Sequence, residues 1–75
     1  MKIEIHHAST HPANTMIYCY DGVSKIARMY EEDLFEIMTD GQIERYQNGE
    51  NVFNLSIQKI KEHCKEYFGI SGMGF

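Results

Sequence analysis

The sequence has no tryptophan, one proline and only two cysteines among its 75 residues. Cys19 and Cys64 are too few for a disulfide framework, and both fall on apolar stripes, where a reduced thiol packs as a small hydrophobe. No apolar run approaches the roughly 18 residues that a membrane span needs. The segment from Met1 to His7 is too polar for a signal peptide. We therefore expect a reduced, cytoplasmic setting without contact to a membrane.

The short length leaves little room for a catalytic cavity. Residues 1–75 are expected to form a single domain, and 43% hydrophobic and 24% charged residues are typical of a globular protein. Ordering the chain costs roughly 110 kcal/mol at ~1.5 kcal/mol per residue, so its core has little surplus stability. We expect a protein that is not an enzyme, needs no cofactor and acts through its surface.

Basic residues are outnumbered as well. Seven lysines and arginines stand against eleven acidic residues, for a formal net charge of −4. This charge disfavours sequence-independent binding of nucleic acid, which needs a basic face. The stretch from Glu31 to Glu50 holds seven acids and one base, Arg45, so it carries −6 and the remainder is slightly positive. This acidic stretch is either a solvated edge or an anionic patch for a basic partner surface.

Three segments of the N-terminal half show strand periodicity. Lys2 to Ala8 alternates apolar and polar side chains, and Thr15 to Tyr20 is rich in β-branched and aromatic residues. Asp21-Gly22 is the dipeptide that a type I′ hairpin turn prefers, so Val23 to Tyr30 is predicted as the third strand. Residues 23–38 also fit a helical period, but the turn signal favours the strand.

The second half predicts one hairpin and one helix. Leu34 to Met38 and Ile43 to Tyr46 are expected to pair around the turn of residues 39–42. Farther on, apolar residues recur every three or four positions, as on one face of a helix: Phe53, Ile57, Ile60, Cys64 and Tyr67/Phe68. Asn51 or Asn54 is expected to cap this helix, and Gly69 to follow it in a left-handed conformation, with Ile70 folding back on Cys64.

Together these elements predict an α+β domain, with an antiparallel sheet of about four strands covered on one face by a C-terminal helix. If that helix covers Ile17 and Cys19, then Tyr18 and Tyr20 point to the open face, with His6 and Arg28 as neighbours. Exposed tyrosines on a sheet are frequent binding anchors. They serve equally to pack against neighbouring strands, and the sequence leaves both roles open.

The histidines and cysteines form no recognisable metal or catalytic motif. His6 and His7 point to opposite faces of a strand, and His63 and Cys64 diverge by about 100° on a helix. His7 and His11 are four residues apart, but Pro12 keeps this segment from forming the helix that would bring them to one side. We expect no metal site and no nucleophile. The tail from residue 69 to 75 is interpreted either as packed on the sheet or as a segment that inserts into a partner.

Two groups of residues resemble a known family. The first comprises Met1-Lys2, Ser9-Thr10-His11, Ile17, Tyr20 before an acid-Gly turn, Ser24-Lys25-Ile26, Arg28 and Glu31. The second is the aromatic and glycine-rich segment Tyr67-Phe68-Gly69-Ile70-Ser71-Gly72-Met73-Gly74. Both are similar to phage-encoded type I-F anti-CRISPR proteins. The similarity covers under half of the chain and is thin between Glu32 and Phe53.

The resemblance implies a four-stranded antiparallel sheet with C-terminal helices and no enzymatic activity. It implies binding to the backbone subunits of a CRISPR surveillance complex in the host cytoplasm, so that target DNA cannot pair with the guide. Tyr20 and Glu31 match interface positions of the family, whereas His6 stands where the family has a tyrosine. We extend the expected binding site to Tyr18 and Glu32. The acids would pair with lysine or arginine of the partner, without direct contact to nucleic acid, and the protein would be a monomer or weak homodimer.

Two other functions are compatible with the sequence. The segment from Gly22 to Tyr30 looks like the first helix of LysM carbohydrate-binding modules and its approach. That function requires a helix over residues 24–38 and a strand near residues 52–57. The other is a small regulatory protein, such as a toxin–antitoxin partner, that dimerises through the tail.

Overall fold

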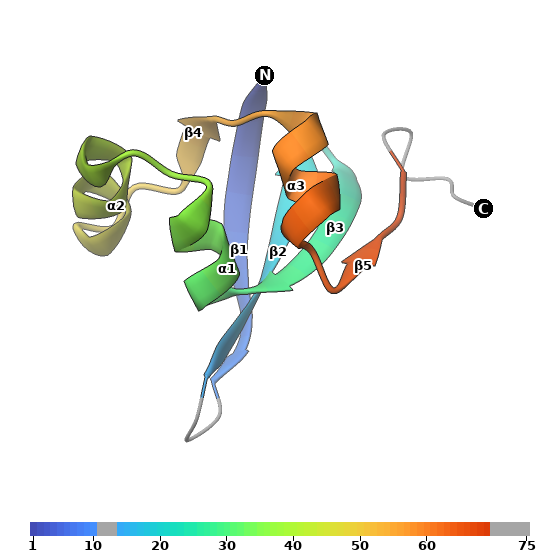
Figure 1. Ribbon diagram of the computed structural model, residues 1–75, viewed down its shortest axis with the longest axis horizontal. Helices are drawn as coiled ribbons and strands as arrows, with labels where there is room; N and C mark the ends of the chain where they lie inside the picture. Colours follow the sequence, from blue (N-terminus) through green and yellow to red (C-terminus); the bar gives the residue numbers. More distant parts are fainter. Residues whose placement is uncertain (11–13, 70–75) are drawn as a thin grey trace.

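The computed structural model describes residues 1–10 and 14–69 (Figure 1). Their elements in chain order are β1 (Lys2–Thr10), β2 (Thr15–Asp21), β3 (Ser24–Tyr30), α1 (Glu31–Glu36), α2 (Asp40–Gln47), β4 (Val52–Asn54), α3 (Ile57–His63) and β5 (Glu66–Tyr67). The strands form one antiparallel sheet in the order β4-β1-β2-β3-β5. The predicted α+β class with an antiparallel sheet is confirmed, and the described residues supply five strands.

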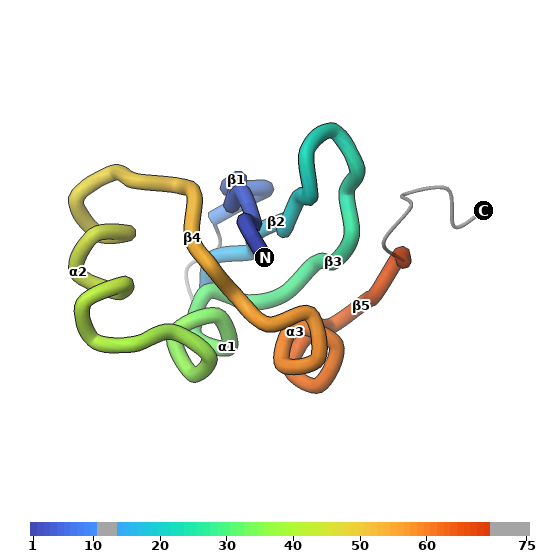
Figure 2. Tube along the Cα trace, turned by 90° about the horizontal axis from the view of Figure 1, so that it is seen from above, coloured from blue at the N-terminus to red at the C-terminus, as the bar shows by residue number. Residues whose placement is uncertain are grey.

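The helices gather on one side and at one edge of this sheet. Figure 2 shows α1 and α3 along one face, with α2 standing beside the β4 edge. Leu34 of α1 and Ile60 of α3 are fully buried in the core, and α2 contributes Tyr46. The opposite face of the sheet is left uncovered by the helices, and we call it the open face. No helix of the described residues combines the length and the apolar character needed to cross a membrane.

Alternating side chains along the long strands build the core. Ile5 of β1 and Cys19 of β2 are buried and lie opposite each other. Ile17 of β2 and Met29 of β3 are fully buried and form the next row. Burying a side chain of this size contributes roughly 1.5–3 kcal/mol, so this face holds the domain together. The three strands predicted from periodicity are therefore confirmed.

The turn between β2 and β3 differs from the predicted type. Asp21 pairs with Ser24, so the two central residues of the turn are Gly22 and Val23. Of the described residues only glycines have positive φ, and Gly22 has 64°. A type I′ turn needs positive φ at both central positions, whereas glycine at the first position alone is the type II′ pattern. The hairpin is confirmed and its turn type is corrected.

A β-bulge sets the direction of the side chains at the start of β3. Cys19 pairs with Ala27 whereas Tyr20 pairs with Lys25, so Ile26 is the extra residue. Ile26 and Ala27 are both fully buried, and the pairing puts Lys25 on the same side as Tyr20. Because residues 24–30 form a strand, the helix that a LysM-like module needs over residues 24–38 is absent.

Residues 31–47 form two helices, so the predicted second hairpin is wrong. The first turn of α1 contains three acidic residues, which the positive end of a helix dipole favours. At the start of α2 the Thr39 hydroxyl accepts from the N–H of Gln42, and the Gln42 side chain accepts from the N–H of Thr39. This reciprocal capping box makes residues 39–42 a helix start, although their composition resembles a turn.

The C-terminal helix is shorter than predicted because both ends of its apolar stripe lie in edge strands. Phe53 belongs to β4 and lies opposite Ile3 of β1. Tyr67 belongs to β5 and lies opposite Ala27 of β3. Only the middle of the predicted stripe, α3, is helical. Segments of two and three residues thus complete the two edges of the sheet.

The predicted caps of this helix are also corrected. The Ser56 hydroxyl accepts from the N–H of Lys59, so Ser56 caps α3. The side chain of Asn54 instead accepts a hydrogen bond from the amino group of Met1. Gly69 has the expected positive φ of 105°, but it follows β5. The predicted contact of Ile70 with Cys64 and the tail of residues 70–75 lie outside the described residues.

We expect Thr39→Ala to lower the free energy of unfolding by about 1 kcal/mol, because it removes the side-chain acceptor at the start of α2. Ser9→Ala removes an exposed hydroxyl from β1 and is the matched control, with a change below about 0.5 kcal/mol. Urea denaturation measures both. Equal effects of the two substitutions would show that the capping box does not stabilise the domain.

Candidate functional site

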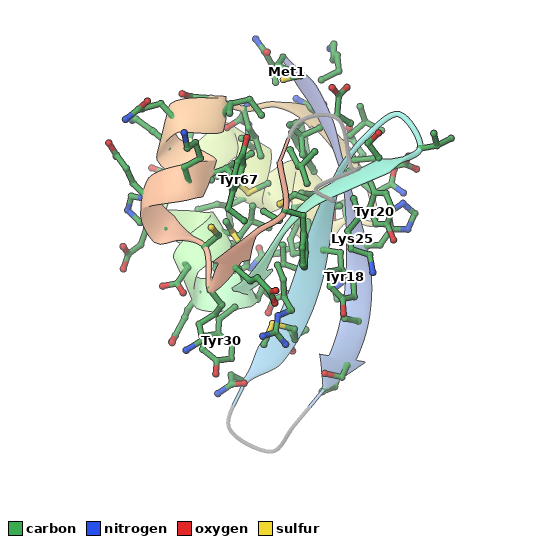
Figure 3. The ribbon with its side chains drawn as sticks, turned by 90° about the vertical axis from the view of Figure 1, so that its right-hand side faces the viewer. Met1, Tyr18, Tyr20, Lys25, Tyr30 and Tyr67 are labelled. Atoms are coloured by element: carbon green, nitrogen blue, oxygen red, sulfur yellow. The ribbon has the colours of Figure 1, made fainter. Side chains whose placement is uncertain are left out.

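The open face carries the aromatic residues predicted from the sequence. His6, Tyr18 and Arg28 lie side by side on β1, β2 and β3. Tyr20 lies between Glu4 and Lys25 in the neighbouring row. Figure 3 shows Tyr18, Tyr20 and Lys25 on the side of the sheet away from the helices. The predicted placement of Tyr18 and Tyr20, with His6 and Arg28 as neighbours, is therefore confirmed.

Ring contacts order this surface. The His6 and Tyr20 rings meet edge to face, with centroids 4.7 Å apart and planes at 72°. Nε2 of His6 lies 3.5 Å from a carboxylate oxygen of Glu4. Both tyrosines are half-buried, so their rings are held in place while one side stays accessible. Ordered aromatic side chains lose little conformational entropy on binding, which suits them to act as anchors.

Sequence reasoning missed the part of the open face beyond β3. The ammonium of Lys25 lies 4.2 Å from the centre of the Tyr18 ring and 5.9 Å from that of Phe68. The ammonium of Lys65 lies 5.2 Å from the Tyr30 ring. These contacts were missed because residues 65–68 were assigned to the helix. No sequence signal marked this strand, because β5 has only two residues and a period of two cannot show in it.

On the open face, Arg28 lies between Tyr18 of β2 and Glu66 of β5. Its Nη2 atom lies 3.5 Å from a carboxylate oxygen of Glu66 on β5. Its Nε atom is buried and has no hydrogen-bond partner within residues 1–10 and 14–69. A buried donor without an acceptor costs stability. The position of Arg28 on this surface therefore lowers the folding stability of the domain.

Glu31 belongs to a different cluster, on the covered side of the sheet. The Tyr46 hydroxyl donates to Glu31 Oε2 at 2.7 Å, and Nε2 of His7 lies 2.8 Å from the same hydroxyl oxygen. Because that hydroxyl gives its proton to Glu31, it accepts the Nε2–H of His7. His7 lies opposite the buried Ile17, which places it on the face of the helices. We call Glu31, Tyr46 and His7 the tyrosine cluster.

The tyrosine cluster joins β1, α1 and α2. Burial first, and then the hydrogen bond to Glu31, raise the pKa of the Tyr46 hydroxyl. Glu32 lies beside Glu31 on α1 and is exposed. The structure thus brings His6, Tyr18 and Tyr20 together, but it does not bring Glu31 or Glu32 to them. The resemblance suggested a common site because Glu31 follows β3 directly, yet the chain turns onto the covered face at that point.

The cysteines and His63 show no sign of nucleophilic chemistry. Burial raises the pKa of the Cys19 thiol to about 12, and burial also raises the pKa of Cys64, which disfavours the reactive thiolate. His63 turns away from Cys64, since its Nδ1 lies 3.0 Å from the Lys59 carbonyl oxygen and its Nε2 lies 3.7 Å from Glu36. No group of three potential metal-binding side chains occurs in the part of the chain that the structure describes.

Comparison with known proteins identifies no relative of this chain: no family model matches it, and no curated protein or solved structure shows significant similarity. The resemblance to type I-F anti-CRISPR proteins therefore stays a prediction. What the geometry offers is a surface for binding, with aromatic rings on the open face and acidic residues on α1 and α2.

We expect Tyr46→Phe to lower the free energy of unfolding by about 1–2 kcal/mol, because it leaves the Glu31 carboxylate without its hydroxyl donor. Tyr20→Phe removes a hydroxyl from the open face and is the matched control, with a change below about 0.5 kcal/mol. Glu31→Gln keeps an acceptor for the hydroxyl and is expected to cost less than Tyr46→Phe. Chemical denaturation measures the free energy of unfolding of the three variants. An equal loss of stability in Tyr46→Phe and Tyr20→Phe would contradict a structural role of the tyrosine cluster.

We also expect stability to fall as the pH rises above 9. In the unfolded chain the Cys19 thiol ionises near its ordinary pKa of 9.0, whereas in the folded protein its pKa is about 12. The unfolded state therefore binds fewer protons in this range, and stability falls by up to ~1.4 kcal/mol per pH unit for this group. Urea midpoints under reducing conditions between pH 8 and 10.5 measure the slope. An equally steep slope for Cys19→Ala would contradict this assignment.

Proposed function

We propose that this chain is a non-enzymatic inhibitor that binds a host protein complex and keeps nucleic acid from its binding surface. The complex proposed is a CRISPR surveillance complex in the cytoplasm of the host cell, with the backbone subunits as the contacted proteins. The similarity of residues 1–31 and 67–74 to type I-F anti-CRISPR proteins supports the choice of target. The open face supports the manner of binding.

The observation that carries this proposal is the contact of His6 with Tyr20 on the open face. Tyr20 stands at a position that resembles an interface position of the family, and His6 replaces a tyrosine of the family. The edge-to-face contact at 4.7 Å shows that a histidine here still forms an aromatic pair with Tyr20. Tyrosine and arginine are the residues most enriched at binding hot spots, and Tyr18 and Arg28 lie next to this pair.

The acidic residues have a different part in this proposal. Glu31 stabilises the domain through the tyrosine cluster, so its effect on binding is indirect. Glu32, Glu36 and Glu44 are exposed on α1 and α2, away from the open face. Exposed charges at the rim of an interface chiefly raise the association rate and set specificity. We assign them that role toward the lysine and arginine side chains that line a nucleic-acid path.

The structure meets only part of what the LysM-like alternative requires. The strand near residues 52–57 that a LysM-like module requires is present as β4, but its helix over residues 24–38 is replaced by β3 and α1. Dimerisation through the tail concerns residues outside those described and stays a prediction.

We expect Tyr20→Ala to weaken binding to a purified type I-F surveillance complex at least six-fold, or more than about 1 kcal/mol, without unfolding the domain. The ring fills the centre of the proposed contact, and its loss leaves His6 without its aromatic partner. Biolayer interferometry measures the affinity, and circular dichroism verifies folding. Gln47→Ala, on the exposed side of α2, is the control and is expected to bind as the unaltered protein does.

Two results would contradict the proposal. A folded Tyr20→Ala variant with unchanged affinity would contradict the role of Tyr20 as an anchor. Absence of binding by the unaltered protein, together with normal pairing of target DNA by the complex, would contradict the choice of the surveillance complex as the target.

A further inference from the structure

Half of the open face carries cations placed over aromatic rings, and the proposed Tyr20 anchor uses neither Lys25 nor Lys65. Lys25 lies over the Tyr18 ring and near Phe68, and Lys65 lies over the Tyr30 ring. Arg28 lies between Lys25 and Tyr30 along β3 and points to the same side. We call these residues the cation–aromatic strip: Tyr18, Lys25, Arg28, Tyr30, Lys65 and Phe68.

We propose that the cation–aromatic strip binds single-stranded nucleic acid. Unpaired bases stack on aromatic side chains of exposed antiparallel sheets, and neighbouring cations follow the phosphate backbone. Within residues 1–10 and 14–69, no carboxylate lies in ion-pair distance of Lys25 or Lys65. Both ammonium groups are therefore available to phosphates while they remain beside the rings on which bases would stack.

The net charge of −4 does not exclude this ligand, because six of the eleven acids lie on α1 and α2. α1 is on the covered face, and α2 stands beside β4, which is three strands or about 14 Å from β3. Salt screens charges beyond ~8 Å at physiological ionic strength. The expectation drawn from the whole chain, that nucleic acid is not contacted, therefore does not apply to this surface.

The local charge of the open face is positive. Four cations lie along it or beside it: Lys2, Lys25, Arg28 and Lys65. Its two carboxylates are Glu4 and Glu66, and each is already 3.5 Å from a basic group of His6 or Arg28. This excess of positive charge fits a polyanion. It distinguishes the strip from the Tyr20 anchor.

The dimensions of the strip set the size of the ligand. From Lys25 to Tyr30 the strand advances about 13 Å, because the paired residues Tyr20 and Met16 are four positions apart, and this corresponds to about four nucleotides stacked at ~3.4 Å. Three cations predict a logarithmic salt dependence of the association constant of about −2 for a single strand. Affinity is therefore expected to fall about twenty-fold between 50 and 200 mM salt, from a dissociation constant on the order of 1–100 µM.

Fluorescence anisotropy with labelled ten-nucleotide RNA and DNA of the same sequence tests this inference directly. The double variant Lys25→Glu/Lys65→Glu is expected to bind at least ten-fold more weakly. Lys59→Glu/Lys61→Glu, the same charge change on α3 at the covered side, is the matched control with less than a two-fold effect. Tyr18→Leu keeps apolar bulk but removes the ring, and is expected to lose five-fold or more. Circular dichroism verifies that each variant is folded.

Three outcomes would overturn the inference. The first is no binding of either oligonucleotide at 50 mM salt up to 1 mM protein. The second is an equal loss for Lys59→Glu/Lys61→Glu and Lys25→Glu/Lys65→Glu, since binding would then follow net charge alone. The third is equal binding of a polyglutamate peptide of the same charge, which would make the strip a site for acidic proteins. Binding of either the RNA or the DNA supports the inference. The ratio of the two affinities reports the contribution of the 2′-hydroxyl.

This inference goes beyond the proposed function and fails separately from it. If the oligonucleotides bind and the surveillance complex does not, only the proposed target is wrong. If the complex binds through Tyr20 and the oligonucleotides do not, only the role of the strip is wrong. If both bind, the strip would contact the guide strand of the complex while Tyr20 contacts its protein.

Discussion

The alternation of side chains along β2 is the constraint on which both surfaces of this sheet depend. Ile17 and Cys19 are fully buried beneath the helices, and a strand has a side-chain period of two, so Tyr18 and Tyr20 must point outward. β1 and β3 pair with β2 on either side and adopt the same division. A shift of one residue would expose the core and bury the tyrosines. The side chains of the open face and the stability of the domain are therefore set by a single register.

The parts of the fold with strong local signals were predictable. Period-two segments flanking a glycine turn identify β1, β2 and β3, and the same alternation places Tyr18, Tyr20 and His6 on one face. The edges were not predictable, because strands as short as β4 and β5 carry too few residues to show a period. Phe53 and Tyr67 happen to continue the helical spacing of α3, so the sequence pattern extended that helix into both edge strands.

The helices of residues 31–47, and the tyrosine cluster that they form with β1, were not predictable from the sequence. A capping box and a turn use the same small polar residues, and only the reciprocal hydrogen bonds of Thr39 and Gln42 distinguish them. The tyrosine cluster joins residues 7, 31 and 46, whose proximity depends on the packing of two helices beside the sheet. For the same reason the sequence assigned Glu31 to the Tyr20 site, while the fold uses it to hold α2.

The bulge at Ile26 separates the tip of the β2–β3 hairpin from its base. Pairing from Met16 to Cys19 is set by the buried rows below the bulge, whereas Tyr20 and Lys25 pair above it. An insertion or deletion in the tip can therefore be absorbed there without moving the buried rows. Variation at the tip would then alter what the open face recognises while the core stays the same. Such a division lets the outer surface of a small domain change during evolution without loss of its core.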